Sequence, residues 1–191
     1  MHCRCWICPF AIRDRGQRAL RSVGSKFMAK TAGSTISIHP DIFALPRGSR
    51  LFPDTNIWVN AIQLTSPFHI EARTALSVLK TNGVKLYTSR QILREYSATM
   101  TRPQSFSTPQ SGLTVDADLN SIMATSSILE DGATVFSEFR NLLVTVNLGR
   151  KQVHDANIAA TLRTYNVLNL LTQDTADFKR FSNFITVIPL T

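Results

Sequence analysis

Four short apolar runs, separated by segments with helical periodicity, constrain the fold of this chain more than any other feature. Each run is short enough for a strand that is buried on both faces. Parallel strands need a crossover connection, and helices are the usual crossovers, so this alternation predicts an α/β fold with a central, mostly parallel sheet. The predicted strands cover Arg50 to Asp54, Val84 to Thr88, Val167 to Thr172 and Ile185 to Pro189.

The segments between these runs carry the expected helix signals. One predicted helix covers Pro67 to Thr81 and stops at Asn82-Gly83, and a second begins at Ser89 and continues through Met100. The Ser-, Pro- and Gln-rich stretch from Arg102 to Thr114 is expected to be a mobile loop. Two further helices, Asp116 to Asp131 and Ala133 to Leu148, are separated at Gly132 and predict a helical hairpin inserted into the α/β framework.

The inserted hairpin is more apolar than packing on one sheet face requires, which predicts a homodimer or partner surface there. The residues that carry this expectation are Leu119, Ile122, Met123, Leu129, Val135, Phe136, Phe139, Leu142 and Leu143.

The first 30 of the 191 residues differ in composition from the rest. They contribute seven Lys or Arg residues and one acid to the net charge of +8, so the positive charge says little about what the remaining chain binds. All three cysteines lie within the first eight residues, and no apolar stretch approaches the roughly 18 to 20 residues that span a bilayer. We therefore expect a cytoplasmic protein without a membrane segment. Residues 1–49 are predicted to be an N-terminal extension, disordered or in part the product of a start placed upstream of Met28, and residues 50–191 the folded domain.

Four acids stand where an α/β fold places its ligand site. Asp54 and Asp174 directly follow predicted strands, whereas Glu95 and Asp155 lie near the beginning of predicted helices. Ligands of open α/β sheets bind at the carboxyl ends of the strands, so the four side chains are expected to converge on one rim. Singly, Asp54 fits a turn or a helix N-cap and Asp155 fits a helix first turn. As an ordered set of four, the acids favour a metal site.

Carboxylates that lie close together repel one another and raise one another's pKa, and a divalent cation relieves this repulsion. Hard oxygen ligands without a His or Cys set favour Mg²⁺ or Mn²⁺. Such an ion would hold a phosphate and lower the pKa of an attacking water, so the predicted reaction is metal-assisted hydrolysis of a phosphodiester.

At these residues the chain resembles the PIN domain, and most of all the VapC-type toxins of bacterial toxin–antitoxin pairs. The resemblance covers about Leu51 to Pro189, and its specificity lies in the order of the motifs. The motifs are Asp54-Thr55-Asn56 after a strand, Arg94-Glu95-Tyr96 followed by Thr101-Arg102-Pro103, His154-Asp155-Ala156 at the beginning of a helix, and Thr172-Gln173-Asp174 followed by Asp177-Phe178.

The resemblance implies a three-layer α/β/α sandwich and metal ligation by Asp54, Glu95, Asp155 and Asp174. It also implies hydrogen-bonding support from Asn56 and Thr55, with Asp177 as the competitor of Asp174 for the fourth role. The sequence departs from the family at Pro53, which precedes the first acid and predicts a bent strand end or an edge strand. The longer loop after Met100 and the segment before Leu51 are further departures, and neither removes an acid.

The implied activity is an Mg²⁺- or Mn²⁺-dependent endoribonuclease that acts on tRNA, rRNA or mRNA as the toxin of a type II pair, with a small antitoxin protein as its partner. The alternative is a PIN-fold module that binds RNA or protein without catalysis, although retention of all four acids speaks against it. His154 could act as a base or contact a phosphate, whereas Trp58 is expected in the core or on a partner surface. Four cations, Arg90, Arg94, Arg150 and Lys151, could contact RNA or simply be solvated. The RNA substrate itself leaves no local code in the sequence.

Overall fold

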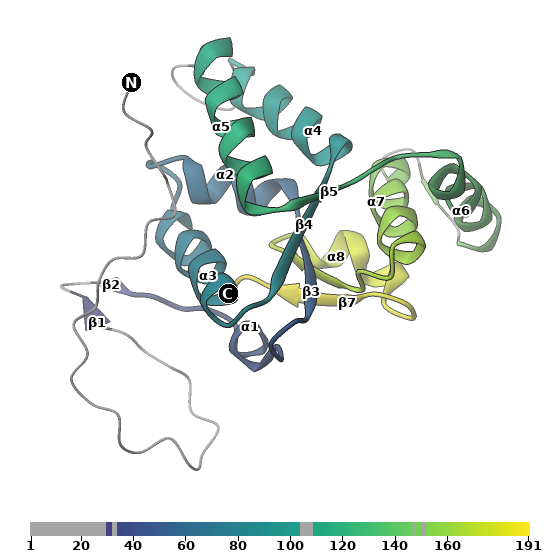
Figure 1. Ribbon diagram of the computed structural model, residues 1–191, viewed down its shortest axis with the longest axis horizontal. Coiled ribbons are helices and arrows are strands. Elements are labelled where there is room, and N and C mark those ends of the chain that lie inside the picture. Colours follow the sequence, from purple (N-terminus) through teal and green to yellow (C-terminus); the bar gives the residue numbers. More distant parts are fainter. Residues whose placement is uncertain (1–29, 32–33, 104–108, 147, 150–151) are drawn as a thin grey trace.

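The architecture is a five-stranded parallel sheet between two groups of helices (Figure 1). The computed structural model describes residues 30–31, 34–103, 109–146, 148–149 and 152–191. The strand order is β5-β4-β3-β6-β7, and every neighbouring pair is parallel, so the predicted central sheet is confirmed. The strands are β3 (Arg50–Pro53), β4 (Lys85–Ser89), β5 (Ser127–Leu129), β6 (Asn169–Thr172) and β7 (Thr186–Pro189).

Helices lie on both sides of the sheet, because right-handed crossovers from β3 towards β5 and from β6 towards β7 use opposite faces. In Figure 1, α3 and α5 lie to the left of the strands, whereas α6 and α7 lie to the right. The helices are α1 (Pro40–Ala44), α2 (Thr55–Ile62), α3 (His69–Thr81), α4 (Arg90–Thr101), α5 (Gly112–Thr125), α6 (Ala133–Thr145), α7 (Val153–Thr164), α8 (Thr175–Phe178) and the 3₁₀ helix η2 (Lys179–Phe181).

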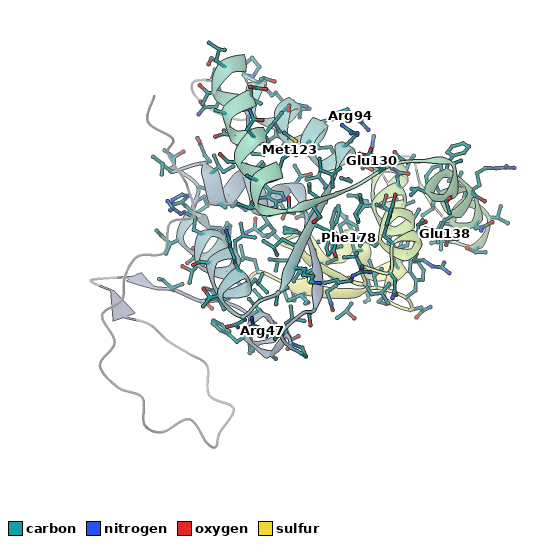
Figure 2. All side chains as sticks on the ribbon, in the orientation of Figure 1. Arg47, Arg94, Met123, Glu130, Glu138 and Phe178 are labelled. Carbon is teal, nitrogen blue, oxygen red and sulfur yellow. The ribbon has the colours of Figure 1, made fainter. Side chains whose placement is uncertain are left out.

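The core is formed by the strands and by the inward faces of these helices. Leu51 and Phe52 on β3 and Leu170 and Leu171 on β6 are fully buried, as expected for central strands covered on both faces. Phe178 of α8 lies in the interior (Figure 2) and is 2% exposed. This packing holds β3 and β6 side by side, and their carboxyl ends carry two of the four predicted acids.

Local signals define the helix ends next to the sheet. Ser89 begins α4 by accepting a hydrogen bond at its Oγ from the Ile92 N–H, at 3.4 Å. Gly83 follows the end of α3 with a φ of +75°, a left-handed conformation that glycine adopts without steric cost. Both ends were predicted from sequence.

The predicted helical hairpin is wrong, because a strand intervenes between its helices. α5 ends at Thr125, and Ser127–Leu129 then forms β5 at the edge of the sheet beside β4. The hydroxyl of Ser126 donates to the Ile122 carbonyl at 2.7 Å. This carbonyl, at the end of α5, would accept a backbone N–H if the helix continued. A strand of three residues is too short to show an alternating pattern. Its apolar residues therefore fitted the periodicity of the predicted helix and were assigned to it.

The apolar residues predicted to form one surface are consequently divided between two sides of the molecule. Met123 on α5 is 37% exposed, and Phe136 and Leu143 on α6 are 59% and 44% exposed. Because α5 and α6 lie on opposite sides of the strands (Figure 1), these side chains do not form a single patch. Other members of the set, among them Ile122 and Leu142, are buried in the core.

Pro53 lies in the central strand of the sheet, so the edge position, one of the two alternatives that it suggested, is wrong. β3 pairs with β6 as far as Pro53, but its pairing with β4 stops at Leu51. The N–H of Asp54 donates to the Leu171 carbonyl on the β6 side at 2.9 Å. Neighbouring backbone groups alternate in direction along a strand, so the nitrogen of Pro53 faces the side where pairing has already ended.

The folded unit begins before residue 50. Ile42 of α1 is fully buried, and the N–H of His39 donates to the Leu190 carbonyl at 3.0 Å. Two short strands, β1 (Lys30–Thr31) and β2 (Ser34–Thr35), pair antiparallel ahead of α1. The predictions for residues 1–29 lie outside the described residues.

The predicted loop from Arg102 to Thr114 is shorter than expected at its end, since α5 already begins at Gly112 behind the N-cap Ser111. Residues 104–108, in the middle of this stretch, are not among those described. In the ranges that the structure describes, no helix is both long and apolar enough to cross a membrane.

Candidate active site

The site is organised around Asp54, which ends the central strand and begins α2. Its Oδ1 accepts a hydrogen bond from the Thr55 N–H at 2.7 Å, so the carboxylate is also the N-cap of α2. Its Oδ2 accepts from the Thr172 hydroxyl at 2.7 Å and from the Asn56 side-chain amide at 2.9 Å. The residue is 7% exposed. Three donors therefore hold this carboxylate at one orientation.

Glu95 reaches the same site from α4. Thr55 Oγ1 donates to Glu95 Oε2 at 2.8 Å, and Gln91 Nε2 donates to Glu95 Oε1 at 2.7 Å. Thr55 therefore connects two acids, with its backbone N–H on Asp54 and its hydroxyl on Glu95. A single residue, Thr55, therefore bridges the carboxylates of the first and second predicted motifs.

Asp174 follows β6 and is connected to Asp54 by a shared donor. Asn56 Nδ2 lies 3.0 Å from Asp174 Oδ2 and 2.9 Å from Asp54 Oδ2. The backbone N–H of Asp174 donates to Thr172 Oγ1 at 3.0 Å, so the same threonine supports both acids. Asp174 is an exposed residue, in contrast to Asp54.

Asp155 stands in the first turn of α7, as predicted, and is half-buried. Its electrostatic neighbours include Glu95 and Asp177, which places it between the second acid and the α8 segment. Asp174 therefore lies beside Asp54, with which it shares the Asn56 donor, whereas Asp177 lies near enough to Asp155 to act on its charge. The structure brings all four predicted acids and Asp177 to the same end of the sheet.

Burial and the proximity of the other acids raise the pKa of two of these carboxyl groups. Burial raises the pKa of Asp54 from 3.8 to about 6; the hydrogen bonds from Thr172 and Thr55 lower it, and the charges of Glu95 and Asp174 raise it further. Burial likewise raises the pKa of Asp155 to about 6, with further increases from Asp177 and Glu95. The charges of His154 and Arg180 act in the opposite direction on Asp155. Ionisation of Asp54 and of Asp155 is therefore costly in this arrangement.

The chemistry of this donor set suits a hard divalent cation, because its ligands are carboxylate oxygens supported by hydroxyl and amide groups. In the conformation of the described residues, no three His, Cys, Asp or Glu side chains lie close enough together to hold one ion. The carboxylates instead accept hydrogen bonds from Thr55, Asn56, Gln91 and Thr172.

Three polar residues of the site were not given a role by sequence reasoning. Thr172 is fully buried and donates to Asp54. Gln91 is 7% exposed, and it donates to Glu95 and, at 3.0 Å, to the His154 carbonyl. Asn157 Nδ2 donates to Gln91 Oε1 at 2.8 Å. The spacing of four residues between Gln91 and Glu95, which places both on one helix face, was the available signal.

Other residues singled out from the sequence have ordinary positions. Trp58 is 2% exposed and belongs to the core, as expected. Arg90 forms an ion pair with Glu130, with its Nε 2.7 Å from Oε2 and its Nη2 2.8 Å from Oε1. Arg94 projects from α4 at the surface (Figure 2) and is exposed. Arg150 and Lys151 fall outside the described residues.

Comparison with known proteins agrees with this geometry. The family model of the PIN domain matches residues 51–183, more than two thirds of the chain. The chain belongs to the PIN domain family. The predicted resemblance is confirmed over nearly the whole range that carried it, and the matched range holds all four acids. No curated protein matches the chain in sequence.

Solved structures share this PIN fold, and each of the three named here covers 73% of the chain. A chain of the VapBC2 complex of Rickettsia felis, bound to a promoter DNA fragment, is 20% identical, with a TM-score of 0.54 and 97% of that chain covered. VapC20 of Mycobacterium tuberculosis, a toxin that cleaves the sarcin–ricin loop, is 16% identical, with a TM-score of 0.51 and 99% of that chain covered. A chain of VapBC-1 of nontypeable Haemophilus influenzae is 16% identical, with a TM-score of 0.52 and 97% of that chain covered. At these identities the likeness is one of fold.

Proposed function

We propose that this PIN domain is a metal-dependent endoribonuclease that hydrolyses RNA phosphodiester bonds. The observation that carries the proposal is the buried carboxylate of Asp54 at the end of the central strand. It is connected to Glu95 through Thr55 and to Asp174 through Asn56, and its pKa is raised to about 6. A buried carboxylate with a raised pKa beside other carboxylates suits the binding of a divalent cation, which offsets the cost of ionisation.

The residues have separate tasks in this proposal. Asp54, Glu95, Asp155 and Asp174 would hold Mg²⁺ or Mn²⁺, which supplies an acidified water and neutralises charge that develops on the phosphate. Thr55 and Asn56 orient the carboxylates through the hydrogen bonds described above. Asp177 adds negative charge beside Asp155. Asp174 is preferred to Asp177 as the fourth acid because it shares the Asn56 donor with Asp54.

We infer further that the nuclease is the toxin of a type II toxin–antitoxin pair. The inference is supported by the shared fold with VapC20 and with chains of the VapBC2 and VapBC-1 complexes. A small antitoxin would block the pocket, and a Lys or Arg side chain on it would complement the cluster of carboxylates. A neighbouring reading frame whose product binds the chain and stops cleavage would distinguish a toxin from a nuclease that acts alone.

A cleavage assay with metal and chelator arms tests the enzymatic proposal. A mixed pool of labelled RNA is incubated with Mg²⁺ or Mn²⁺, or with EDTA, and with wild type, Asp54→Asn or Asp116→Asn. Asp116 is an exposed acid on α5, so its substitution controls for loss of one negative charge. Cleavage should require metal, survive Asp116→Asn and disappear in Asp54→Asn.

Isothermal titration with Mn²⁺ gives a readout that does not depend on turnover. Wild type and Asp116→Asn should bind the ion, and Asp54→Asn should bind it more weakly. RNA binding without cleavage by the folded wild type would instead favour the non-catalytic binding module. Cleavage that continues in EDTA would contradict the role given to the metal.

A further inference from the structure

A groove with a volume of about 300 Å³ borders the carboxylate cluster at Asp174. Its wall is formed by the N-cap of α3, the residues that follow β6, and the end of β7 with the residues after it. The lining residues are Phe68, Gln173, Asp174, Pro189, Leu190 and Thr191. A molecule bound at the acids could therefore extend into this groove without passing through another part of the protein.

The polar wall of the groove is held by a chain of hydrogen bonds. Asn60 donates through its Nδ2 to Gln173 Oε1, and Asn60 Oδ1 in turn accepts from the Ser66 hydroxyl at 2.6 Å. The backbone N–H of Gln173 donates to Asn56 Oδ1 at 3.3 Å, which ties the same residue to the site of the acids. With Oε1 engaged, the orientation of the Gln173 amide is set. Its Nε2 donates to no residue in the described part of the chain.

The apolar wall contains an aromatic ring that the fold does not bury. Phe68 is 37% exposed at the beginning of α3, although the next residue, His69, is buried. His69 anchors the start of α3, because its Nδ1 lies 3.1 Å from the Asn60 carbonyl. An accessible ring next to an oriented amide is the combination with which proteins hold a single-stranded base: the ring stacks on the base face and the amide contacts its edge.

We propose that this groove is a nucleobase subsite of the enzyme. It holds the base of the nucleotide next to the phosphate at the carboxylates, with Phe68 stacked on the base and Gln173 Nε2 donating to an acceptor on its edge. The proposal rests on the proposed ribonuclease function and names a part of the substrate that the function leaves open. A base is joined to its own phosphate through one sugar, and the groove shares Asp174 with the acid cluster, so the groove adjoins the place that the phosphate would occupy.

Binding of short RNA to the cleavage-deficient Asp54→Asn protein tests the subsite. Fluorescence anisotropy compares a labelled single-stranded RNA hexamer with the same hexamer carrying one abasic nucleotide, moved through each position in turn. In the Asp54→Asn background, adding Phe68→Ala should weaken binding of the intact hexamer by about 5- to 100-fold, the loss typical of a base that no longer stacks. It should leave unchanged the affinity of the hexamer whose abasic nucleotide occupies the groove.

Three further variants complete the design. Phe136→Ala removes an exposed ring from α6, across the molecule from α3 (Figure 1), and should bind both hexamers like its parent. Phe68→Leu keeps an apolar side chain at the position and separates lost stacking from a folding defect, since it should fold normally and still bind the intact hexamer weakly. Gln173→Leu should alter the preference among U, C, G and A at one position.

The outcomes separate the subsite from the enzyme. If Phe68→Ala binds the intact hexamer like its parent, or weakens intact and abasic hexamers equally, the subsite is wrong. In that case, cleavage by wild type that depends on Asp54 would leave the ribonuclease standing. If wild type neither cleaves nor binds RNA, the proposed function and the subsite both fail.

Discussion

Gln91 should be the most sensitive uncharged position of the site, because one buried amide joins three parts of the fold. Its Nε2 donates to Glu95 on the same helix and to the His154 carbonyl on α7, and its Oε1 accepts from Asn157. Asn157 also donates to Asp131, in the segment between β5 and α6, at 3.2 Å. Substitution Gln91→Leu keeps the approximate volume and removes all three contacts.

The magnitude follows from what these partners lose. A buried group left without its hydrogen-bond partner costs about 1 to 3 kcal/mol, and more when the partner is charged. Glu95 and Asn157 are only half-buried, so water replaces part of what they lose, and Gln91 itself is 7% exposed. We expect the free energy of unfolding to fall by roughly 2 to 4 kcal/mol. In the proposed enzyme, Mn²⁺ affinity should fall about tenfold as Glu95 loses a supporting contact.

Urea denaturation at pH 7 in EDTA, followed by circular dichroism, measures the change in stability, and titration of Mn²⁺ measures the change in affinity. Asn120→Leu is a matched control, because Asn120 donates to Asp116, also four residues away on a helix, but on the exposed side of α5. A loss of stability in Gln91→Leu no larger than in this control would refute the reasoning from burial. Unchanged Mn²⁺ affinity with reduced stability would refute the link to Glu95.

Three other substitutions or conditions test the electrostatics. Burial raises the pKa of Asp54 from 3.8 to about 6, so between these values the folded state holds a proton that the unfolded state has released. The free energy of unfolding of the metal-free protein should therefore fall as pH rises from about 4 to about 6, and Asp54→Asn should flatten this slope. Urea denaturation across that range measures both. A free energy of unfolding that rises over this range would contradict the raised pKa of Asp54. Tyr96→Phe should cost about 2 kcal/mol in the same assay at pH 7, because the Tyr96 hydroxyl donates at 2.8 Å to Asp118, which is 6% exposed; a neutral result would mean that water replaces the contact. Arg90→Ala should leave the thermal midpoint within experimental error, because its ion pair with Glu130 is exposed and solvent replaces it; a clear drop would contradict this.

The positions of three of the four acids were predictable from sequence because each of the three has a local landmark. Asp54 and Asp174 follow apolar runs that become β3 and β6, and Asp155 lies in the first turn of a helix. Parallel strands bring such positions to one end of a sheet whatever the order of the strands. The supporting donors had no comparable landmark. Asn157 reaches Gln91 across 66 positions of the chain, a contact that no local pattern encodes.

The errors have the same physical origin. β5 consists of three residues whose strand conformation depends on pairing with β4, so its intrinsic pattern was indistinguishable from the end of a helix. Pro53 lacks a backbone N–H, which suggested an edge strand as one alternative. It is tolerated in the central strand because β3 pairs with β6 as far as Pro53 but with β4 only as far as Leu51.

Local sequence patterns were enough to predict that apolar runs and helices alternate, that the sheet is parallel and that four acids lie at its carboxyl end. Those features depend on periodicity and on residues next to one another in the chain. Long-range packing sets the order β5-β4-β3-β6-β7, the separation of α5 from α6, and the donors that hold each carboxylate. It also formed the groove beside Asp174, whose walls come from three segments far apart in sequence. Such features arise when distant side chains compete for the same buried space and hydrogen-bond partners, and that competition is settled only in the folded chain.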